Sequence, residues 1–206
     1  MPAGSEARTN ARKEEIINAC EELYQTVSFK DITLKDIAAK TTFSRTSIYN
    51  YFQTKEEIFL ALLKREYDRW IEELNQITVE HETMDNNTIA ASIAHSLEHR
   101  EQLLKILSMN HYDLEENCRM ESLVEFKVSY GNAMWAIMAL LAKFRLDMTI
   151  ACQQEFVYSF FPFLFGIYPY TVVTKKQEEA MAKANVNYIH NTIYQLAYSA
   201  VRKLLE

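Results

Sequence analysis

Hydrophobic positions recur at helical spacing along most of the chain. In the first such run the apolar residues follow one another at i, i+1, i+4, i+7, i+8 and i+11, which places them on one face of a helix. They are Ile16, Ile17, Cys20, Leu23, Tyr24 and Val27. The pattern predicts that this helix ends near Ser28.

Two short helices and a long one are predicted next, each opened by a hydroxyl residue. The Thr33–Asp36 stretch is typical of a capping box. After a turn at Thr41–Phe43, Ser44 is placed to cap the second short helix. Thr54–Glu57 resembles a stronger capping box and predicts a long helix along Ile58, Phe59, Leu62, Leu63, Trp70, Leu74 and Ile77.

Polar breaks divide the rest of the chain into helical segments. The breaks are residues 81–88, 109–117 and 145–149. Helices are therefore predicted over about residues 88–107, 116–144 and 150–170, with a last helix, capped by Thr174–Gln177, that runs nearly to the C-terminus. We expect an all-α fold in which an N-terminal three-helix bundle, residues 9–55, precedes a larger helical bundle, residues 56–206.

Composition agrees with a helical protein that has a sizeable core. Hydrophobic residues make up 49% of the 206 positions, whereas Gly and Pro number only three each, which argues against a loop-rich β architecture. The three cysteines, Cys20, Cys118 and Cys152, lie far apart, and no apolar leader opens the chain. These features predict a reducing, cytoplasmic setting in which the cysteines are small buried hydrophobes.

The most apolar run, residues 156–173, raises the question of a membrane span. Ser159, Pro162, Gly166 and Pro169 interrupt it. We therefore expect a kinked helix that is buried in protein, and no membrane partner.

Charge is unevenly distributed along the chain. The net charge is −6, but residues 1–55 contain eight cations and seven anions, so almost all of the acidity lies in the later residues. This distribution is compatible with an N-terminal end that contacts DNA.

Two short helices joined by a tight turn indicate a helix-turn-helix unit, in which the second helix enters the major groove. Its outward side is polar and bears Arg45, Thr46, Ser47, Tyr49 and Asn50. An Arg can bind guanine bidentately and an Asn can bind adenine. Thr33 and Lys55 lie at helix N-termini, where phosphate binds, and Tyr51 adds a phenol just after the recognition helix.

Over Ala11–Leu62 the chain resembles the TetR family of one-component repressors, through "TLKDIA", "FSRTSIYNYF" and "KEEIF". The resemblance implies that Lys35 approaches bases or phosphate and that Tyr51 and Lys55 clamp phosphate. It also implies a DNA-facing role for Arg45, Thr46, Ser47, Tyr49 and Asn50.

Three positions depart from that family's pattern, which usually has Gly. This chain has Ser28 after the first helix, Thr42 in the turn and Thr46 in the recognition helix. We expect Ser28 and Thr42 to close their turns at some cost in backbone strain. Thr46 either contacts a base or pushes the helix slightly outward.

The resemblance also implies that the later residues bind a small-molecule effector and form a homodimer through the last two helices. The apolar faces in question are Phe156, Val157, Phe160, Phe161, Leu164 and Phe165 on one helix, and Ile189, Ile193, Leu196, Ala197, Ala200, Val201 and Leu204 on the other. The alternative is that these faces are intrachain core.

Aromatic and Met side chains on the central helices are candidates for an apolar effector pocket, although such residues also form ordinary cores. The candidates are Phe126, Tyr130, Trp135, Met138, Tyr158 and Phe161. Gly131 has no side chain and offers room beside Trp135.

The leading interpretation is a homodimeric DNA-binding transcriptional regulator, a repressor that a small-molecule effector releases from its double-stranded operator. Nothing in the sequence predicts a cofactor, a metal or an enzyme. One alternative is an α-helical metal-dependent hydrolase, because His95, Glu98 and His99 form an H-x-x-E-H pattern without an evident third ligand. Another is a helical adaptor whose N-terminal domain has lost DNA binding.

Overall fold

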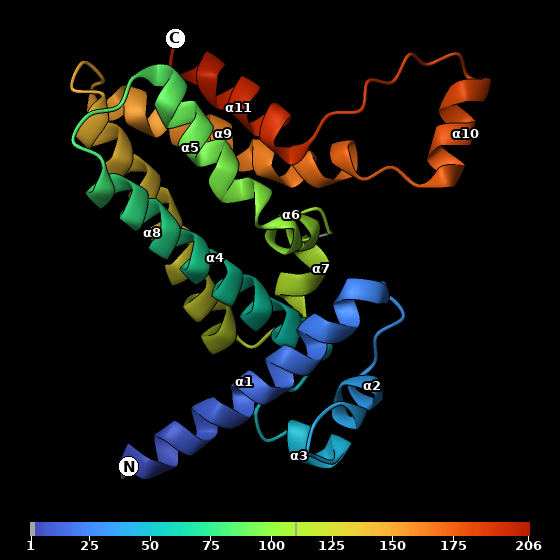
Figure 1. The fold of residues 1–206 in the computed structure, drawn as a ribbon. Helices are drawn as coiled ribbons and strands as arrows, with labels where there is room; N and C mark the ends of the chain where they lie inside the picture. Colours follow the sequence, from blue (N-terminus) through green and yellow to red (C-terminus); the bar gives the residue numbers. More distant parts are fainter. Residues whose placement is uncertain (1–2, 110) are drawn as a thin grey trace. The chain divides into compact units, whose positions relative to one another are not determined.

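The computed structural model describes residues 3–109 and 111–206, and it consists of helices joined by turns and irregular segments (Figure 1). The helices in these residues are α1 Ala3–Thr26, α2 Leu34–Ala39, α3 Arg45–Ile48, α4 Lys55–Glu80, α5 Asn86–Glu98, α6 Glu101–Leu107, α7 His111–Glu116, α8 Met120–Phe144, α9 Ile150–Thr171, α10 Lys175–Lys183 and α11 Ile193–Leu204. No strand occurs among the described residues. The prediction of an all-α fold is confirmed.

The chain divides into two compact units, which are described separately. The first unit comprises residues 1–65 and 110–128, and the second comprises residues 66–109 and 129–206. Both α4 and α8 therefore contribute a segment to each unit.

The first unit has a core built from the apolar face of α1 and the start of α4. Ile16 and Cys20 of α1 are fully buried, as the periodicity predicts. The rings of Tyr24 and Phe29 meet the edge of Phe59 at centroid distances of 5.0 and 4.8 Å. Burial raises the pKa of the Cys20 thiol to about 12, so this cysteine behaves as a hydrophobe. The corresponding expectation is wrong for Cys152, which is exposed.

Both predicted short helices are present and capped as expected. The Asp36 backbone N–H donates to the Thr33 hydroxyl at 3.3 Å, and the Thr33 N–H donates to the Asp36 carboxylate at 2.9 Å, which completes the capping box. The Ser47 N–H donates to Ser44 Oγ at 3.2 Å and opens α3. Ile37 and Ile48 are fully buried where the two helices pack together.

The turns beside these helices close without the expected strain. Among the described residues, Asn185 is the one non-glycine position with a positive φ, so neither Ser28 nor Thr42 adopts a left-handed conformation. Side-chain hydrogen bonds stabilise both turns instead. The Ser28 hydroxyl donates to Asp31 at 2.5 Å, and both the backbone N–H and the hydroxyl of Thr42 donate to Glu15, at 2.7 and 2.8 Å.

The predicted capping box at the start of α4 is only half correct. The Glu57 N–H donates to the Thr54 hydroxyl at 3.1 Å, as a capping box requires. The Glu57 carboxylate, however, accepts from the Gln53 N–H at 2.8 Å and from Arg119, and is buried. The Glu57 carboxylate therefore takes part in a long-range ion pair in place of the capping-box hydrogen bond with the Thr54 backbone N–H.

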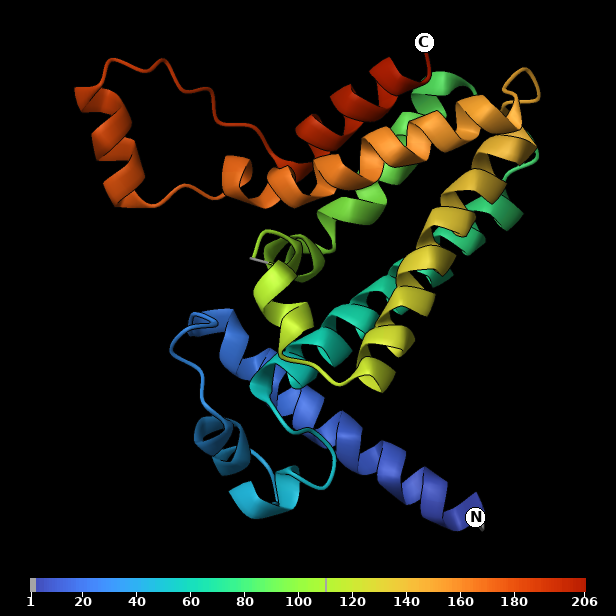
Figure 2. The same ribbon diagram turned by 180° about the vertical axis from the view of Figure 1, so that it is seen from behind.

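The second unit packs α5, α6, α9 and α11 against one another, and α4 and α8 run side by side within it (Figures 1 and 2). The Ser129 hydroxyl of α8 donates to Asp68 of α4 at 2.6 Å. Trp70 is fully buried, and its indole N–H donates to the hydroxyl of Ser96 on α5 at 2.9 Å. These two hydrogen bonds pair polar groups of different helices within the unit.

Three helix predictions need correction. The segment predicted as one helix over residues 88–107 breaks at His99 and Arg100. The Arg100 guanidinium donates to Glu73 and to the Arg69 carbonyl. The predicted break at residues 109–117 contains the short helix α7. The predicted last helix is two helices, because Asn185 with φ 54° follows the end of α10 and an irregular segment precedes α11.

Helix α9 contains the most apolar run, with Pro162 and Pro169 inside it. Within the described part of the chain, no single helix combines the length and the apolarity needed to cross a membrane; α9 and α10 meet that test only as a pair, which is bent by 85°.

Of the two faces predicted to form the dimer interface, the one on α9 is largely internal, whereas most members of the second are half-buried or, like Ile189, exposed. On α9 the buried members are Phe156, Val157, Phe160, Phe161 and Leu164. On α11, Ala197 and Val201 are buried, because this helix packs on α5 and α9 of its own chain. For these residues the alternative of an intrachain core is the correct one.

Candidate nucleic-acid interface

The polar edge of α3 is exposed in the first unit. Arg45, Thr46 and Asn50 are exposed, Tyr49 is 44% exposed, and Ser47 is half-buried. The opposite side of the helix is anchored by Ile48, which is fully buried. The helix therefore presents the side chains that the sequence assigns to base contact.

Arg45 and Tyr49, one helical turn apart, contact each other on this edge. The Arg45 guanidinium lies 6.0 Å from the centre of the Tyr49 ring and donates to its hydroxyl at 3.2 Å. Such a cation–π contact restrains a long side chain before any DNA is bound. The Ser44 and Ser47 hydroxyls lie 2.9 Å apart at the start of the same helix.

Arg12 of α1 contacts Tyr51, one of the predicted phosphate-binding residues, although Arg12 itself was not predicted to contact DNA. Its guanidinium donates to the Tyr51 hydroxyl at 2.9 Å and lies 5.7 Å from the centre of the Phe43 ring. The hydrogen bond to Tyr51 raises the pKa of Arg12. The only signal for Arg12 in the sequence was its positive charge. Its partner Tyr51 is 39 residues away, so no local pattern links the two.

Lys55 is already engaged within the unit. Its ammonium donates to the carbonyls of Phe29 and Ile32, at 2.8 and 3.1 Å, and lies 4.3 Å from the centre of the Phe29 ring. Lys55 thus stabilises the turn between α1 and α2. Its role as a phosphate clamp stays a prediction, as do those of Thr33, the exposed N-cap of α2, and Lys35, which is exposed in α2.

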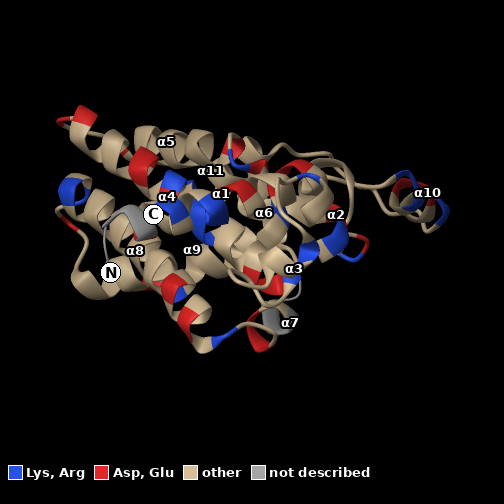
Figure 3. Cartoon of the chain, turned by 90° about the horizontal axis from the view of Figure 1, so that it is seen from below, with Lys and Arg blue, Asp and Glu red and all other residues tan. Residues whose placement is uncertain are grey.

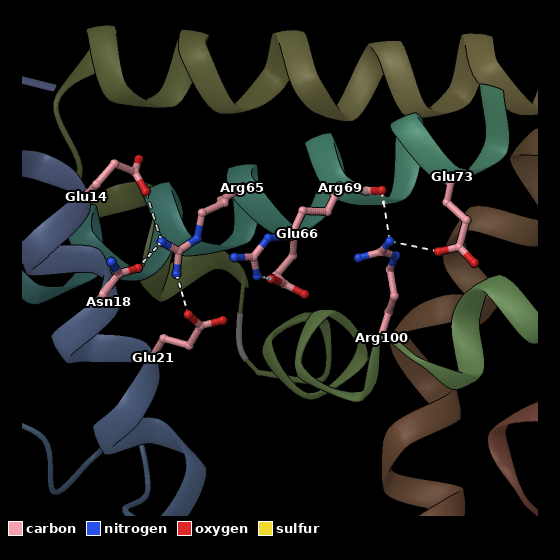
Figure 4. A network of polar contacts seen from close by, with 8 residues as sticks. All are labelled: Glu14, Asn18, Glu21, Arg65, Glu66, Arg69, Glu73 and Arg100. Atoms are coloured by element: carbon pink, nitrogen blue, oxygen red, sulfur yellow. Dashed lines mark hydrogen bonds and ion pairs between the residues drawn. The ribbon is translucent and has the colours of Figure 1, made fainter. Parts of the chain in front are cut away.

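Further polar contacts hold α1, the turn and α4 together in the first unit. Arg65 of α4 donates to Glu14, Asn18 and Glu21 of α1, at 3.0, 2.6 and 2.7 Å (Figure 4). The hydrogen bonds from Thr42 lower the pKa of Glu15. These contacts fix the helix that supports the helix-turn-helix.

An ion pair links the buried Glu57, in the first turn of α4, to Arg119, just before α8. The Arg119 side chain donates to both Glu57 carboxylate oxygens, at 2.7 and 2.9 Å, and its backbone N–H donates at 3.0 Å. Arg119 also donates to the Tyr51 carbonyl at 3.1 Å, directly after the recognition helix. Burial alone would raise the pKa of Glu57, but hydrogen bonds from Arg119 and from the Gln53 N–H lower it overall.

The second unit contains an aromatic cluster that includes two of the predicted pocket residues. Tyr130 and Phe161 meet edge to face, with ring centres 5.6 Å apart. Tyr67 and Trp70 join them, at 5.8 Å from Tyr130 and 5.9 Å from Phe161. Neither Tyr67 nor Trp70 is among the predicted pocket residues; helical periodicity marks Trp70 as core, and no pattern in the sequence singles out Tyr67.

The structure does not bring the other pocket candidates into this cluster. Trp135 and Tyr158 are 67% and 70% exposed. Met138 is half-buried, and Phe126 belongs to the first unit. A Cβ atom on Gly131 would meet no atom within 4 Å, so this glycine adjoins open space.

Arg100 anchors α6 in the second unit. It donates to Glu73 at 2.8 Å and to the Arg69 carbonyl at 2.9 Å, while Arg69 pairs with the buried Glu66 at 2.6 Å (Figure 4). These ion pairs all involve α4.

A separate cavity of about 390 Å³ lies between the α8–α9 turn and the end of α11. Its lining includes Arg145, Asp147, Cys152, Phe156 and Lys203. The hydrogen bond from Arg145 lowers the pKa of Asp147 to about 2. None of the predicted pocket residues lines this cavity.

The H-x-x-E-H stretch does not form a metal centre. His95 Nδ1 lies 3.2 Å from the Glu98 carboxylate, and the His95 ring lies 4.4 Å from that of Tyr194. His99 caps the end of α5. No group of three or more His, Cys, Asp or Glu side chains suited to a metal occurs among the described residues, so the hydrolase interpretation is not supported.

An exposed short helix, braced by a second helix across a tight turn and followed by an all-helical body, defines a helix-turn-helix regulator. Residues 16–62 match the bacterial regulatory proteins of the tetR family, and residues 64–204 match the tetracyclin repressor-like C-terminal domain. The chain therefore belongs to the TetR family of DNA-binding transcriptional regulators, which are generally not enzymes.

Individual relatives are distant. The HTH-type regulator YfiR of Bacillus subtilis is 26% identical over 83 residues, a match that spans 40% of each chain. A protein of Mesorhizobium loti assigned to the TetR family has a TM-score of 0.63 at 15% identity, with 96% of each chain covered. The fatty acid degradation regulator FadR of Bacillus halodurans has a TM-score of 0.60 at 13% identity, with 94% of each chain covered. FadR of B. subtilis, in complex with stearoyl-CoA, has a TM-score of 0.58 at 14% identity, covering 94% of this chain and 97% of FadR.

Proposed function

We propose that this protein is a homodimeric, cytoplasmic repressor that binds a double-stranded operator through α3 and is released by a small-molecule effector held in the second unit. The observation that carries the DNA-binding part is the exposed edge of α3 above the buried Ile48. Two copies are required, because a palindromic operator presents two half-sites to a two-fold symmetric protein.

Within the interface, Arg45 and Asn50 are assigned to base edges, and Tyr51 with Arg12 to phosphate. Arg45 is restrained by Tyr49, so less conformational freedom is lost when it binds guanine. Tyr51 and Arg12 form a hydrogen-bonded pair beside the recognition helix, and both groups can donate to a phosphate oxygen.

The experiment is a binding titration with DNA fragments that flank the gene. The Arg45→Ala, Asn50→Ala double variant is compared with wild type, and Lys203→Ala at the far end of α11 serves as a matched loss of an exposed cation. Each lost base contact costs about 1–3 kcal/mol, so the double variant should bind at least tenfold more weakly, whereas Lys203→Ala should not. Equal affinity of the double variant and wild type would refute the proposed interface.

The effector is assigned to the aromatic cluster of Tyr67, Trp70, Tyr130 and Phe161, whose rings favour an apolar ligand. An effector there would favour a dimer whose recognition helices no longer match the operator spacing. The coupling is reciprocal, so operator DNA should weaken effector binding by the same factor. Because FadR of B. subtilis was solved with stearoyl-CoA, long-chain acyl-CoA is the first probe.

The chain's two tryptophans distinguish the cluster from the other predicted pocket residues. Trp70 is fully buried in the cluster, where its ring contacts that of Phe161, whereas Trp135 is 67% exposed. Stearoyl-CoA should therefore change the fluorescence of the Trp135→Phe variant, which retains Trp70. It should leave the fluorescence of the Trp70→Phe variant unchanged. The reverse response would move the site to Trp135, and no response in wild type would exclude this ligand.

A further inference from the structure

The segment between α9 and α11, residues 172–192, extends away from the other helices of the second unit (Figures 1 and 2). We call this segment the arm. Its helix α10 contains no buried residue. The arm is hydrogen-bonded at both ends, since the Val172 N–H donates to the Tyr168 carbonyl and Thr192 caps α11. Between its ends, Lys183 pairs with Glu179 at 2.6 Å, and the Tyr188 hydroxyl donates to the carbonyl of Tyr170 in α9.

The arm nevertheless has a defined local structure. Thr174 and Gln177 form a complete capping box at the start of α10, and Asn185, with φ 54°, follows its end. A helix of nine residues is marginal in water without tertiary contacts. Apolar side chains on the arm are also exposed, with Val186 at 54% and Ile189 at 70%. These features call for a surface that covers the arm.

Helix α9, from which the arm starts, has an exposed apolar stripe on the side opposite its core. Tyr158 is 70% exposed, and Pro162 and Pro169 are also exposed. At 3.6 residues per turn these three positions fall within about 40° of the helix circumference, outside the arc that contains the buried Phe156, Phe160 and Phe161. We call them the outer α9 stripe. Glu155 is the one charged residue in α9.

We propose that the arm packs against the outer α9 stripe of a second copy of this chain, so that each copy in the dimer contributes its arm to α9 of the other. This inference rests on the homodimer of the proposed function and names the segment that stabilises it. It shares Ile189 with the interface predicted from the sequence, but it uses the outer side of α9 in place of the buried face of that helix.

Charge favours a second copy over other partners. An interface with two-fold symmetry brings the same patch of both copies together, so a patch with few charges avoids like-charge repulsion. The outer α9 stripe meets this condition. Helix α10 contains Lys175, Lys176 and Lys183 with Glu178 and Glu179, and Figure 3 shows both signs on it. Such a mixed surface does not suit DNA or an anionic membrane, which require an excess of cations.

Size supports the same partner. A stable protein interface engages about 20–30 residues a side. The outward positions of α9 alone fall short of that number. Residues 172–192 bring the surface into this range, and none of them is fully buried within its own unit.

Photocrosslinking of the purified protein tests the inference. p-Benzoylphenylalanine replaces Ile189 in the arm, and in a control it replaces Leu146, which is 88% exposed in the α8–α9 turn. Irradiation should yield covalent dimers from the Ile189 position, linked to peptides of α9, and none from Leu146. Crosslinks that stay within one chain, or dimers formed equally from both positions, would overturn the proposal.

A second measurement separates this proposal from the homodimer itself. Ile189→Asp should raise the dimer dissociation constant at least tenfold in sedimentation experiments, while Leu146→Asp leaves it unchanged. If wild type is dimeric and Ile189→Asp dimerises equally well, the arm proposal fails and the homodimer stands. If wild type is monomeric on operator DNA, the homodimer fails as well.

Discussion

Glu57 shows how a single side chain can act differently from its sequence context. The Thr54–Glu57 pattern predicts a local capping box, yet the carboxylate is buried and accepts from Gln53 and Arg119. The partner is 62 residues away, so no local pattern could identify it. Arg119 also binds the Tyr51 carbonyl, so this ion pair stabilises the residues that follow the recognition helix.

Arg119→Met should destabilise the protein more than Glu57→Gln does. The first change leaves a buried carboxylate without its charged donor, whereas the second leaves Arg119, whose side chain is 42% exposed, free to contact water. Hydrogen bonds to charged groups contribute about 1.5–3 kcal/mol, and we expect a loss of that order for Arg119→Met in urea unfolding near neutral pH. An equal effect of the two variants would contradict this assignment.

The same pair predicts a pH dependence. The pKa of Glu57 is lowered in the folded protein, so its contribution to stability is present above the ordinary value of 4.5 and is lost as the pH falls through the folded pKa. The difference in unfolding free energy between wild type and Arg119→Met should therefore shrink below pH 4.5. Urea unfolding at neutral and acid pH measures this difference.

At the scale of elements, the recognition helix is only four residues long and depends on its cap. The Ser47 N–H donates to Ser44 Oγ, and Ile48 anchors the helix in the core. Such a short helix has little intrinsic stability, so the cap and the buried anchor determine its position.

Replacement of Ser44 tests the cap. Ser44→Ala should lower the free energy of unfolding by about 1 kcal/mol, whereas Ser44→Gly should lower it by only a few tenths, because glycine is tolerated at an N-cap. Operator affinity should follow the same order. Thermal or urea unfolding of the two variants provides the measurement, and a larger loss for the glycine variant would mean that the hydroxyl is not the cap.

At the scale of the whole molecule, a net charge of −6 accompanies a DNA-binding role. Lys and Arg are interspersed with Asp and Glu over the chain (Figure 3). We therefore expect operator binding to depend on local cations and on helix N-termini more than on the net charge.

Operator binding should still depend steeply on salt. A dimer that contacts about six phosphates should lose roughly 10³-fold in affinity between about 50 and about 200 mM salt. Arg12→Ala should reduce the slope of log affinity against log salt, since it removes a proposed phosphate contact, and Lys203→Ala should not. Fluorescence anisotropy over a salt series measures both slopes. An unchanged slope in Arg12→Ala would assign Arg12 to positioning Tyr51 alone.

The sequence by itself determined the features that depend on local patterns. Helical periodicity identified the buried face of α1, and hydroxyl residues located the caps at Thr33 and Ser44. The two short helices with their family motifs indicated the helix-turn-helix. These features are predictable because a helix face repeats every few residues and a cap involves near neighbours.

Only the tertiary structure decided which distant residues meet. It paired Arg12 with Tyr51 and Glu57 with Arg119, and it placed Lys55 on the carbonyls between α1 and α2. It also separated Trp135 and Tyr158, which are exposed, from the aromatic cluster, and divided the last predicted helix into α10 and α11. Each outcome depends on how helices far apart in the sequence pack, and periodicity reports that a face is apolar without identifying the surface that covers it.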